Sequence, residues 1–391
     1  MAVNLTNADS ALKTYYLDAV AEQLNFNANP FLAEVKQTTE DVWGKEVRKL
    51  AIYGINGGIG AGTEDGQLPE SAGNNYAQFV TTLKNLYGSV EITDKAVRAS
   101  ENNAGAFVNL LNAEIEGLVK ASTYNLGRML FGDGSGTIAS VCGISDGIIV
   151  VDTPINVIEG MIIDFRDTNG NLIEGATGRR ILGLDRGLNA MMVSGSAITA
   201  DLVPMGSLIT VQGSYNNELT GLGAIFDMDR QTLYGVDRFN HGWMRPYVLS
   251  DVGQLSEIKL QTALDTIEEN SGSAVNFIMC SWGVRRALQK LLSTNRQMDT
   301  VELAGGYKAM TYNGIPIVVD RFCPEGTMYL LNTNDFQLHQ LCDWQWLEGD
   351  DGKVLKQIPG KPVYSATLVK YADLICSRPS GQGMLSGITE G

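Results

Sequence analysis

The chain has 391 residues and a formal net charge of −15, and 44% of its residues are hydrophobic. This length predicts two or three domains, or one core with insertions. The negative charge disfavours tight binding to nucleic-acid phosphates, and no run of about 18 apolar residues predicts a membrane span. The N-terminal residues lack the charged and apolar regions of a secretory signal, so we expect no such signal here.

Cysteine and histidine usage limits the chemistry that the chain can support. The five cysteines are odd in number and never in C-x-x-C spacing, which predicts reduced, mostly buried thiols in a cytosolic product. They are Cys142, Cys280, Cys323, Cys342 and Cys376. The sequence contains two histidines, His241 and His339, so we expect neither a metal cluster nor a histidine-based catalytic triad.

Residues 1–42 are predicted to form a polar N-terminal arm. Apolar residues at helical spacing over 11–24 predict a helix, which the asparagine-rich segment before Pro30 ends. The arm has too few apolar positions to fold alone, so we expect it to pack against something else.

The most glycine-dense stretch is 53–66, with the sequence YGINGGIGAGTEDG. Thr63 breaks the dinucleotide fingerprint G-x-G-x-x-G, and it also stands where a P-loop needs lysine. The segment 63–70 is acidic and contains proline, so it cannot begin a helix whose amide groups face a phosphate. We therefore interpret the stretch as a flexible loop tip and not as a nucleotide site.

Two extended runs, 45–53 and 76–93, flank this loop tip. In the second run the apolar face changes parity near Lys84 and Asn85, which predicts a bulge or bend. We expect one long two-stranded hairpin. Because an isolated hairpin is only marginally stable in water, we also expect this one to lie on another subunit.

A long helix is predicted next. Ser100 is placed to cap it, and apolar residues recur at three- and four-residue steps from Val108 to Met129. The helix over 101–131 has roughly eight turns and a length of about 45 Å. The glycine-rich segment 132–136 ends it.

From 138 to 216 short apolar runs alternate with turn signals, which predicts a small all-β insert, either a barrel or a sandwich. The segment 167–171 is similar to a calcium loop, but its glycine comes too early, and we interpret it as a hairpin turn. From 217 onward the pattern is mixed and predicts an α/β layer. Its predicted elements are helices over 255–269 and after Ser281, and strands at 275–279, 314–319, 327–331, 343–347 and 364–375.

No constellation of residues predicts catalysis, cofactor binding or metal binding. The acidic pair Asp227 and Asp229 and the segment 348–352 are interpreted as solvated turns. Arg285 and Arg286 form one basic pair on an acidic protein, which is weak support for phosphate binding. Trp344 and Trp346 have strand spacing and are expected to fill a core or an interface.

The order of these parts resembles that of the tailed-phage major capsid proteins. The resemblance rests on the glycine-tipped hairpin that ends at 90–93, on the helix 101–131, and on the step from 314–320 into 324–330. The segments 364–372, 377–380 and 385–388 are similar to the closing strand and the final A-domain segment of that family. The β insert departs from the minimal family pattern.

The resemblance implies an α+β capsid fold with an inserted all-β domain. It implies the following division: an N-terminal arm (1–42), an E-loop hairpin (43–98), a P-domain spine helix (99–137), the inserted β domain (138–216), an A-domain (217–340), P-domain strands (341–375) and a C-terminal A-domain segment (376–391). It also implies that the arm and the E-loop reach neighbouring subunits. No isopeptide crosslink is assigned to Lys84 or Asn85.

The function implied by this family is a structural one. The chain is expected to assemble with itself into hexamers and pentamers of an icosahedral shell around double-stranded DNA, and not to be an enzyme. Portal, scaffold and decoration proteins are further candidate partners, and no cofactor, metal or membrane is expected. We expect the protein in the virion capsid, after synthesis and assembly in the host cytoplasm.

Three alternatives stay open from the sequence. The first is a cellular nanocompartment shell of the same fold that encloses an enzyme cargo. The second is an α/β nucleotide-binding enzyme that uses the strand–helix unit 277–292, although neither phosphate motif is complete. The third is another virion component, such as a tail or decoration protein.

Overall fold

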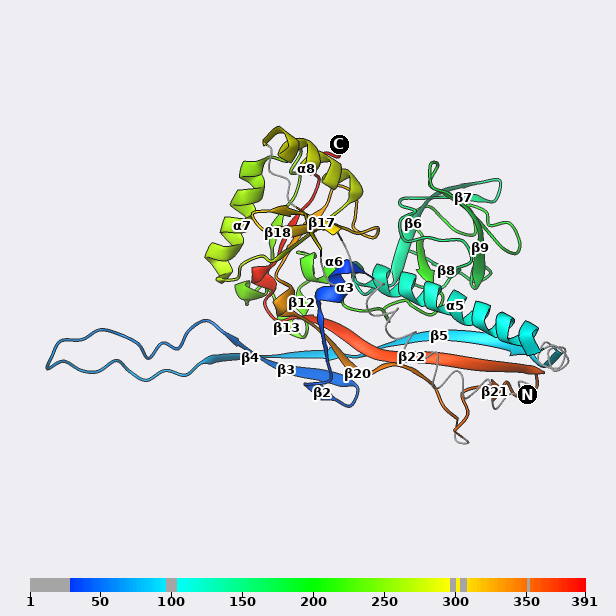
Figure 1. Cartoon of the computed structure of the whole chain (residues 1–391), viewed down its shortest axis with the longest axis horizontal. Coiled ribbons are helices and arrows are strands. Elements are labelled where there is room, and N and C mark those ends of the chain that lie inside the picture. Colours follow the sequence, from blue (N-terminus) through cyan, green and yellow to red (C-terminus); the bar gives the residue numbers. More distant parts are fainter. Residues whose placement is uncertain (1–28, 96–103, 296–299, 303–307, 350–351) are drawn as a thin grey trace.

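The computed structural model describes residues 29–95, 104–295, 300–302, 308–349 and 352–391. The predicted arm helix over 11–24 lies outside these residues. The described chain has four parts: a layer of long strands covered by a long helix, an extended hairpin, a closed barrel and a sheet flanked by helices (Figure 1).

The strand layer is built around β22 (Val363–Cys376). One edge of β22 pairs antiparallel with β5 (Lys84–Thr93), and the other edge pairs antiparallel with β20 (Phe336–Trp346). The short strand β1 (Lys36–Thr38) lies parallel to β20, and β21 (Lys356–Gln357) pairs with the first residues of β22. The sequence analysis predicted a strand only at 343–347, which covers the second half of β20.

The helix α5 (Ala104–Met129) covers the layer along β5 (Figure 1). Alternate residues of β5 are buried, and a Cβ atom at Gly88 would lie 2.9 Å from Leu118 Cδ1 of the helix. The 26 residues of α5 span about 39 Å. The long helix predicted from apolar spacing is therefore present, and its predicted first residues, 101–103, lie outside the described chain.

The extended hairpin consists of β3 (Glu46–Tyr53), β4 (Asn75–Thr82) and the connecting residues 54–74, with β2 (Val42–Trp43) paired to β3. The prediction that the whole run 76–93 belongs to the hairpin is wrong, because the strand is interrupted at Leu83 and its second half, β5, pairs with β22 in the strand layer. Leu83 is buried, and the turn lets β4 and β5 bury side chains of opposite parity. The predicted bend is thus real, but β5 lies on its own subunit and not on another one.

The inserted β domain is a closed barrel with the strand order β10-β7-β6-β11-β8-β9. The structure therefore selects a barrel over a sandwich. Its strands are β6 (Thr137–Ser145), β7 (Ile148–Val151), β8 (Ile162–Arg166), β9 (Arg179–Asp185), β10 (Ala190–Val193) and β11 (Leu208–Val211). Its buried side chains, such as Ile149, Phe165 and Ile209, form a hydrophobic core separate from the main one.

The segment 167–171 is a turn, as predicted. The Asp167 carboxylate accepts hydrogen bonds from the backbone amides of Asn169 at 2.9 Å and Asn171 at 2.8 Å. Gly170 has a φ of +87°, which glycine adopts without strain. The carboxylate thus closes a turn between Arg166 and Leu172, which form a β-bridge.

The fourth part is a seven-stranded sheet in the order β14-β23-β19-β15-β18-β17-β16, flanked by α7 and α8 (Figure 1). Its elements are β14 (Tyr247–Leu249), α7 (Glu257–Ser271), β15 (Phe277–Cys280), α8 (Trp282–Asn295), β16 (Thr300–Glu302), β17 (Lys308–Tyr312), β18 (Ile315–Val319), β19 (Met328–Leu331) and β23 (Gly383–Leu385). Phe277 and Met279 of β15 face the main core, while Ile278 and Cys280 face the two helices. Ser256 and Ser281 cap α7 and α8 through their hydroxyl oxygens.

Residues 212–246 connect the barrel to this sheet and contain α6 (Leu222–Phe226), β12 (Thr232–Leu233) and β13 (Val236–Asp237). The connection is fixed to the end of α5 by a buried ion pair, Arg128–Glu218, in which both side chains are 2% exposed. Arg128 Nη1 donates to Glu218 Oε2 at 2.8 Å. The first strand of the seven-stranded sheet, β14, begins at residue 247. The domain boundaries inferred from the sequence stay a prediction.

Short elements complete the chain. The helix α3 (Pro30–Glu34) precedes β1, and three 3₁₀ turns lie at Gly242–Met244, Thr333–Asp335 and Pro379–Gly381. In α3 the residues Pro30, Phe31 and Leu32 are buried, and the Phe31 ring meets the edge of Phe336 with a centroid distance of 5.0 Å. The beginning of the described chain is therefore held in the main core.

The connection 212–246 approaches the end of α5 closely at Gly221, and substitutions there test this approach. A Cβ atom there would lie 2.5–2.7 Å from the carbonyl oxygens of Met129, Leu130 and Gly132. Gly221→Ala is expected to lower the free energy of unfolding of the unassembled chain by about 1–3 kcal/mol. Gly117→Ala, on the exposed side of α5 with open space around it, is expected to raise it by about 0.5–1 kcal/mol. Urea unfolding followed by circular dichroism measures both, and equal midpoints would contradict the close approach.

Candidate assembly surfaces

The paired strands β3 and β4, which we call the root of the extended hairpin, are anchored by a cluster of aromatic rings. Phe79 is fully buried and stacks on Trp243 with a centroid distance of 5.8 Å, and Trp243 stacks on Tyr53 at 5.1 Å. Tyr234 and His241 complete the cluster, with His241 meeting the Tyr53 ring at 5.5 Å. His241 is therefore an aromatic packing partner of the hairpin.

A buried carboxylate ties the same root to two other segments. Asp373 of β22 accepts a hydrogen bond from Thr81 Oγ1 of β4 at 2.6 Å. It also accepts hydrogen bonds from the backbone amide and hydroxyl of Thr220 at 2.8 and 3.1 Å. Burial raises the pKa of Asp373 above its usual range. The carboxylate therefore holds the hairpin, β22 and the connection after the barrel in one arrangement.

Lys49 fixes the other strand of the hairpin. Its Nζ donates to Gln337 Oε1 at 2.6 Å and to Ser377 Oγ at 2.8 Å. Partial burial lowers the pKa of Lys49. Since these partners lie on β20 and just after β22, both hairpin strands are bound to the strand layer by polar contacts.

The opposite face of the hairpin is apolar and exposed. Ile52 pairs with Tyr76, and Leu50 lies two residues along on the same face. The three side chains are 64%, 55% and 61% exposed, respectively. One face of the hairpin therefore packs on its own subunit. The other face has apolar side chains that the described chain does not cover.

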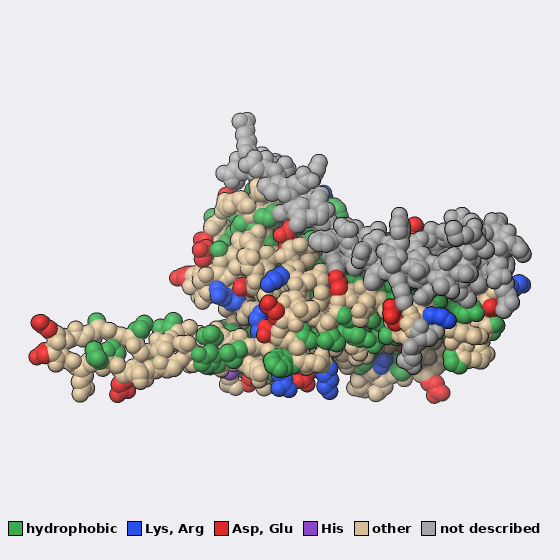
Figure 2. Space-filling view, turned by 60° about the horizontal axis from the view of Figure 1, so that its bottom comes forward, with side chains coloured by type: hydrophobic (Ala, Val, Ile, Leu, Met, Phe, Trp, Pro, Cys, Tyr) green, Lys and Arg blue, Asp and Glu red, His purple; other side chains and the backbone are tan. Residues whose placement is uncertain are grey.

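The connecting residues 54–74 form the free end of the hairpin, which extends away from the body of the molecule (Figure 1). They contain three carboxylates, Glu64, Asp65 and Glu70, and neither lysine nor arginine. Figure 2 shows acidic side chains at this end. Ile55, Ile59 and Leu68 are 73–89% exposed. The tip is thus both acidic and apolar.

A groove of about 810 Å³ lies between α5 and the barrel. Its lining includes Leu118 and Tyr124 of α5, Met161 and Ile162 at the start of β8, and Phe322. The Tyr124 hydroxyl donates to the carbonyl of Ile155 at 3.1 Å, which joins the helix to the barrel. Lys120 and Arg321 also line the groove, and the Arg321 guanidinium lies 4.8 Å from the centroid of the Tyr124 ring.

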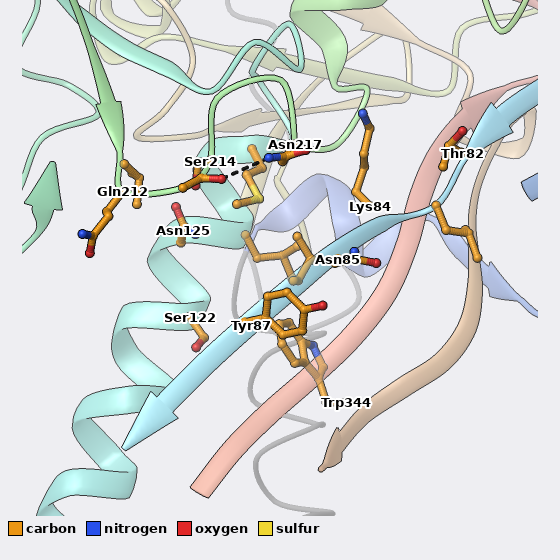
Figure 3. A pocket seen from close by; sticks show the side chains of 16 residues that line it. Thr82, Lys84, Asn85, Tyr87, Ser122, Asn125, Gln212, Ser214, Asn217 and Trp344 are labelled. Atoms are coloured by element: carbon orange, nitrogen blue, oxygen red, sulfur yellow. Dashed lines mark hydrogen bonds between the residues drawn. The ribbon is translucent and has the colours of Figure 1, made fainter. Parts of the chain in front are cut away.

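A second cavity of about 490 Å³ adjoins this groove between β5, α5 and the connection after β11 (Figure 3). Lys84 and Asn85 of β5 lie opposite Ser122 and Asn125 of α5, and Asn217 closes the upper side. The Lys84 Nζ donates to a backbone carbonyl, that of residue 216, at 3.3 Å. The lining residues carry amide and hydroxyl groups together with the Lys84 amine, and no carboxylate is among them.

The described chain begins at a buried polar anchor. Asn29 caps α3 through its side-chain oxygen, which accepts the Phe31 amide at 2.7 Å. Its Nδ2 donates to Asp320 Oδ2 at 2.7 Å, while the Phe322 amide donates to Asp320 Oδ1 at 2.8 Å. Burial raises the pKa of Asp320 to about 6. This carboxylate therefore fixes the point at which the N-terminal arm meets the body.

The two tryptophans at strand spacing lie in the core, as expected. Trp344 and Trp346 are 4% and 6% exposed. Beneath them Lys370 is fully buried, and its Nζ contacts Asp343 Oδ1 at 2.8 Å and lies 5.7 Å from the centroid of the Trp344 ring. Burial lowers the pKa of Lys370, and the Asp343 carboxylate opposes this shift because it favours the charged amine.

The remaining candidate residues have structural contacts. His339 is fully buried, its Nδ1 lies 2.9 Å from the carbonyl of Glu40, and burial lowers its pKa. The Asp227 carboxylate accepts the Asp229 amide at 3.0 Å and so closes a turn. In the segment 348–352, of which 350–351 lie outside the described residues, the Gly349 amide donates to the carbonyl of residue 353 at 2.8 Å.

The N-terminus of α8, where a nucleotide-binding enzyme would hold phosphate, contains a carboxylate of the chain. Glu390 Oε1 accepts hydrogen bonds from Ser281 Oγ at 2.6 Å and from the Gly326 amide at 2.8 Å. Arg285 stacks on the ring of Trp282, and Arg286 donates to the carbonyl of the last residue of the chain at 2.7 Å. The basic pair and the helix N-terminus therefore bind the chain itself, which disfavours the enzyme alternative.

Within the described part of the chain, no group of three or more histidine, cysteine, aspartate and glutamate residues is arranged to hold a metal ion. No described helix is both long and apolar enough to cross a membrane. The five cysteines are free thiols: Cys280, Cys323 and Cys376 are buried, Cys342 is half-buried and Cys142 is exposed.

The middle of the chain matches the model of a known protein family. Residues 171–351 match the family model described as SU10 major capsid protein. No curated protein matches the sequence. The matched residues contain the second half of the barrel, most of the seven-stranded sheet and β20, so the match spans parts that are distinct in space.

The fold is similar to those of solved capsid structures. The cyanophage A-1(L) capsid protein aligns with a TM-score of 0.55 and 12% identity, over 97% of this chain and 94% of that chain. The capsid of Myoviridae phage XM1 gives 0.44 and 10% over 93% and 92%, and the encapsulin of Synechococcus elongatus gives 0.45 and 11% over 90% and 85%. The first of these similarities confirms the predicted α+β capsid fold, while the closed barrel follows from the strand pairing of this chain.

Asp320 generates a prediction about acid stability. Its pKa is raised from 3.8 to about 6 on folding, so its contribution to stability is fully present below about pH 3.8 and is lost as the pH rises through 6. Relative to Asp320→Asn, the wild-type chain is expected to gain stability between pH 7 and pH 4, by on the order of 3 kcal/mol at most. Asp146→Asn, at an exposed turn, is the matched control.

The measurement for this prediction is urea unfolding of the unassembled chain at several pH values. The difference in unfolding free energy between wild type and Asp320→Asn should change with pH, while the difference for the control should not. A pH-independent difference at Asp320 would show that the carboxylate is not titrating at this anchor.

Proposed function

We propose that the chain is a phage major capsid protein and that it assembles into hexamers and pentamers of an icosahedral shell that encloses double-stranded DNA. The observation that carries this proposal is the extended hairpin, whose apolar outer face has no cover within the described chain. The role is structural, and its main partner is a further copy of the same chain.

The geometry of the hairpin supports contact between subunits. Its two strands of eight residues extend about 26 Å, and the connecting residues add further reach beyond the body (Figure 1). The root is held by Asp373, Lys49 and the aromatic cluster, so the outer face is presented in a fixed direction. A rigid root with an exposed apolar face favours binding to a second protein surface over packing on its own subunit.

Such weak contacts stabilise an assembly because every subunit repeats them. Each hairpin offers only a few apolar side chains, so one contact alone is weak. In a closed shell every subunit both donates and receives a hairpin, and the contacts add over the whole assembly. We propose that the N-terminal arm, which meets the body at Asn29, provides a second set of contacts between subunits.

The charge of the chain supports loose enclosure of DNA. With a formal net charge of −15 the subunit repels phosphate groups on average, so packaged DNA is not held tightly by the wall. We propose the virion as the site of function, assembly in the host cytoplasm, and portal, scaffold or decoration proteins as further partners.

Negative-stain microscopy of the purified chain tests the proposal directly. Closed shells or capsomer rings are expected. Particles that enclose a protein cargo and exclude DNA would favour a nanocompartment, and a chain that stays monomeric at high concentration would contradict self-assembly.

The exposed face of the hairpin generates a specific prediction. Leu50→Asp combined with Ile52→Asp is expected to leave unfolding of the isolated chain nearly unchanged, because both side chains are already exposed. The assembled fraction is expected to fall at least tenfold, because the new carboxylates would be desolvated in the contact. Sedimentation velocity measures this fraction.

The matched control places the same charges on the barrel. Leu182 and Leu188 are 61% and 72% exposed, close to the exposures of Leu50 and Ile52. Leu182→Asp combined with Leu188→Asp is expected to assemble like wild type. An equal loss in both double variants would mean that the hairpin face has no special part in assembly.

A further inference from the structure

The cavity of about 490 Å³ between β5, α5 and the connection after β11 is lined by hydrogen-bond donors (Figure 3). We propose that it binds a small oxyanion, a carboxylate or a phosphate group, in contact with Lys84 and Asn125. Such a ligand would belong to the single subunit, so this site goes beyond the proposed shell function.

The lining has a positive charge and no negative one. Lys84 is the one basic residue among the described residues that line the cavity, and none of them is an aspartate or a glutamate. The whole chain has 44 acidic and 29 basic residues, so a cavity without a carboxylate departs from its average composition. A cationic ligand would meet an amine and no counter-charge, and the charge of the lining therefore favours a negative occupant.

The Lys84 amine has hydrogens left for a ligand. An ammonium group has three donors. Within the described chain Lys84 Nζ donates to one acceptor, the carbonyl of Asn216, at 3.3 Å. Asp373 attracts this amine electrostatically, but the Asp373 oxygens accept hydrogen bonds from Thr81 and Thr220. A bound anion would receive the hydrogens of Lys84 that these contacts leave over.

The orientation of the Asn125 carboxamide is fixed by Arg128. Arg128 Nη2 donates to Asn125 Oδ1 at 2.7 Å, and Arg128 Nε donates to the same oxygen at 3.3 Å. A guanidinium has no acceptor, so the carboxamide must turn its oxygen toward Arg128 and its Nδ2 hydrogens away from it. Within the described chain Nδ2 has no acceptor, and Asn125 lines the cavity. The amide is thus held as a donor for a ligand, while the charge of Arg128 is neutralised by Glu218.

Further donors surround these two groups. Ser122 of α5 and Ser214 of the connection line the cavity with hydroxyl groups (Figure 3). Trp344 belongs to the same lining and is 4% exposed, and its Nε1 is buried without a hydrogen-bond partner in the described chain. A buried donor without an acceptor is costly, and an anion in the cavity would satisfy it through an ordered water. All of these groups can donate, which matches a ligand that only accepts hydrogen bonds.

The size and the frame of the cavity fit a small ligand. Its volume of about 490 Å³ lies within the range of small-molecule sites, about 300–1,000 Å³. The connection is held by its own hydrogen bonds: Asn217 Nδ2 donates to the carbonyl of residue 213 at 3.1 Å, and the Asn217 amide donates to the carbonyl of Ser214 at 2.9 Å. The donors are therefore in place before a ligand binds, which lowers the entropic cost of binding.

A bound anion would join three elements that are distant in the sequence. Lys84 begins β5, Asn125 lies near the end of α5, and Ser214 follows β11. Because a ligand held by all three binds only the folded arrangement, it stabilises that arrangement by mass action. The ion would hold the start of β5 against α5, at the point where the chain leaves the hairpin.

Titration calorimetry of the unassembled full chain at constant ionic strength tests the proposal, with inorganic phosphate and citrate as separate probes. Saturable binding of one ion per chain is expected. Saturation with phosphate assigns the site to phosphate groups, and saturation with citrate alone assigns it to carboxylates. Heats that saturate with neither ion would overturn the proposal. Because the chain is unassembled, the result does not depend on whether shells form.

Two substitutions separate this site from general surface charge. Lys84→Met removes the charge and keeps the stem, whereas Asn125→Asp keeps an oxygen for Arg128 and adds a negative charge to the cavity. Each is expected to raise the dissociation constant at least tenfold, because charge-assisted hydrogen bonds are lost or like charges meet. Lys361→Met and Asn74→Asp, at exposed positions that do not line the cavity, are expected to bind like wild type. Wild-type binding by Asn125→Asp, or equal losses in the controls, would contradict the site.

The Trp344 indole gives a readout that needs neither substitution. The chain has five tryptophans, so its indole N–H resonances are few, and the one missing from Trp344→Phe belongs to Trp344. In the wild-type chain this resonance is expected to shift along the same saturation curve as the heat. An ion that binds and leaves this resonance unmoved would lie elsewhere, and the proposal would fail. Urea unfolding without ligand shows whether a variant that does not bind is still folded, and for an unfolded variant the wild-type resonance decides.

Discussion

The structure depends on one strand whose backbone is hydrogen bonded along both edges. β22 pairs with β5 from Val363 to Ala372 and with β20 from Leu368 to Cys376. Because buried backbone amides and carbonyls must be paired, both neighbours are required wherever the strand is buried. The helix α5 packs on β5, and β1, which belongs to the N-terminal arm, pairs with β20. The positions of the long helix, the hairpin root and the arm are therefore all set by β22.

Buried polar groups on and beside this strand add directional contacts to its packing. Burial shifts the pKa values of Asp373, Lys370 and Asp320 against their ionised forms, so each charge is costly to bury alone. Each is compensated by hydrogen bonds from segments distant in sequence, such as Thr81 and Thr220 to Asp373. We infer that these groups specify how the segments are aligned, whereas the apolar core supplies most of the stabilisation.

The subunit leaves apolar surface uncovered where a second copy is expected. The outer face of the hairpin and the groove beneath the barrel are both exposed, while the main core is closed. The barrel buries its own core and, being closed, has no free strand edge that would pair nonspecifically. It therefore adds a wall beside α5 without taking part in the main core, and the hairpin and groove remain available for ordered contacts between subunits.

By itself the sequence determined the order of the parts: a glycine-rich loop tip between two strands, a long amphipathic helix, an all-β insert and an α/β layer. These follow from local periodicity and turn chemistry, which act over a few residues. Only the tertiary structure decided that β5 leaves the hairpin for β22, that Asp373 and Lys49 anchor the hairpin root, and that the barrel and α5 enclose a groove. Thr81, Thr220 and Asp373 lie far apart in the sequence and have no common local pattern. Which strand edges pair and which carboxylate becomes buried depend on contacts between distant segments, and local patterns carry no information about such contacts.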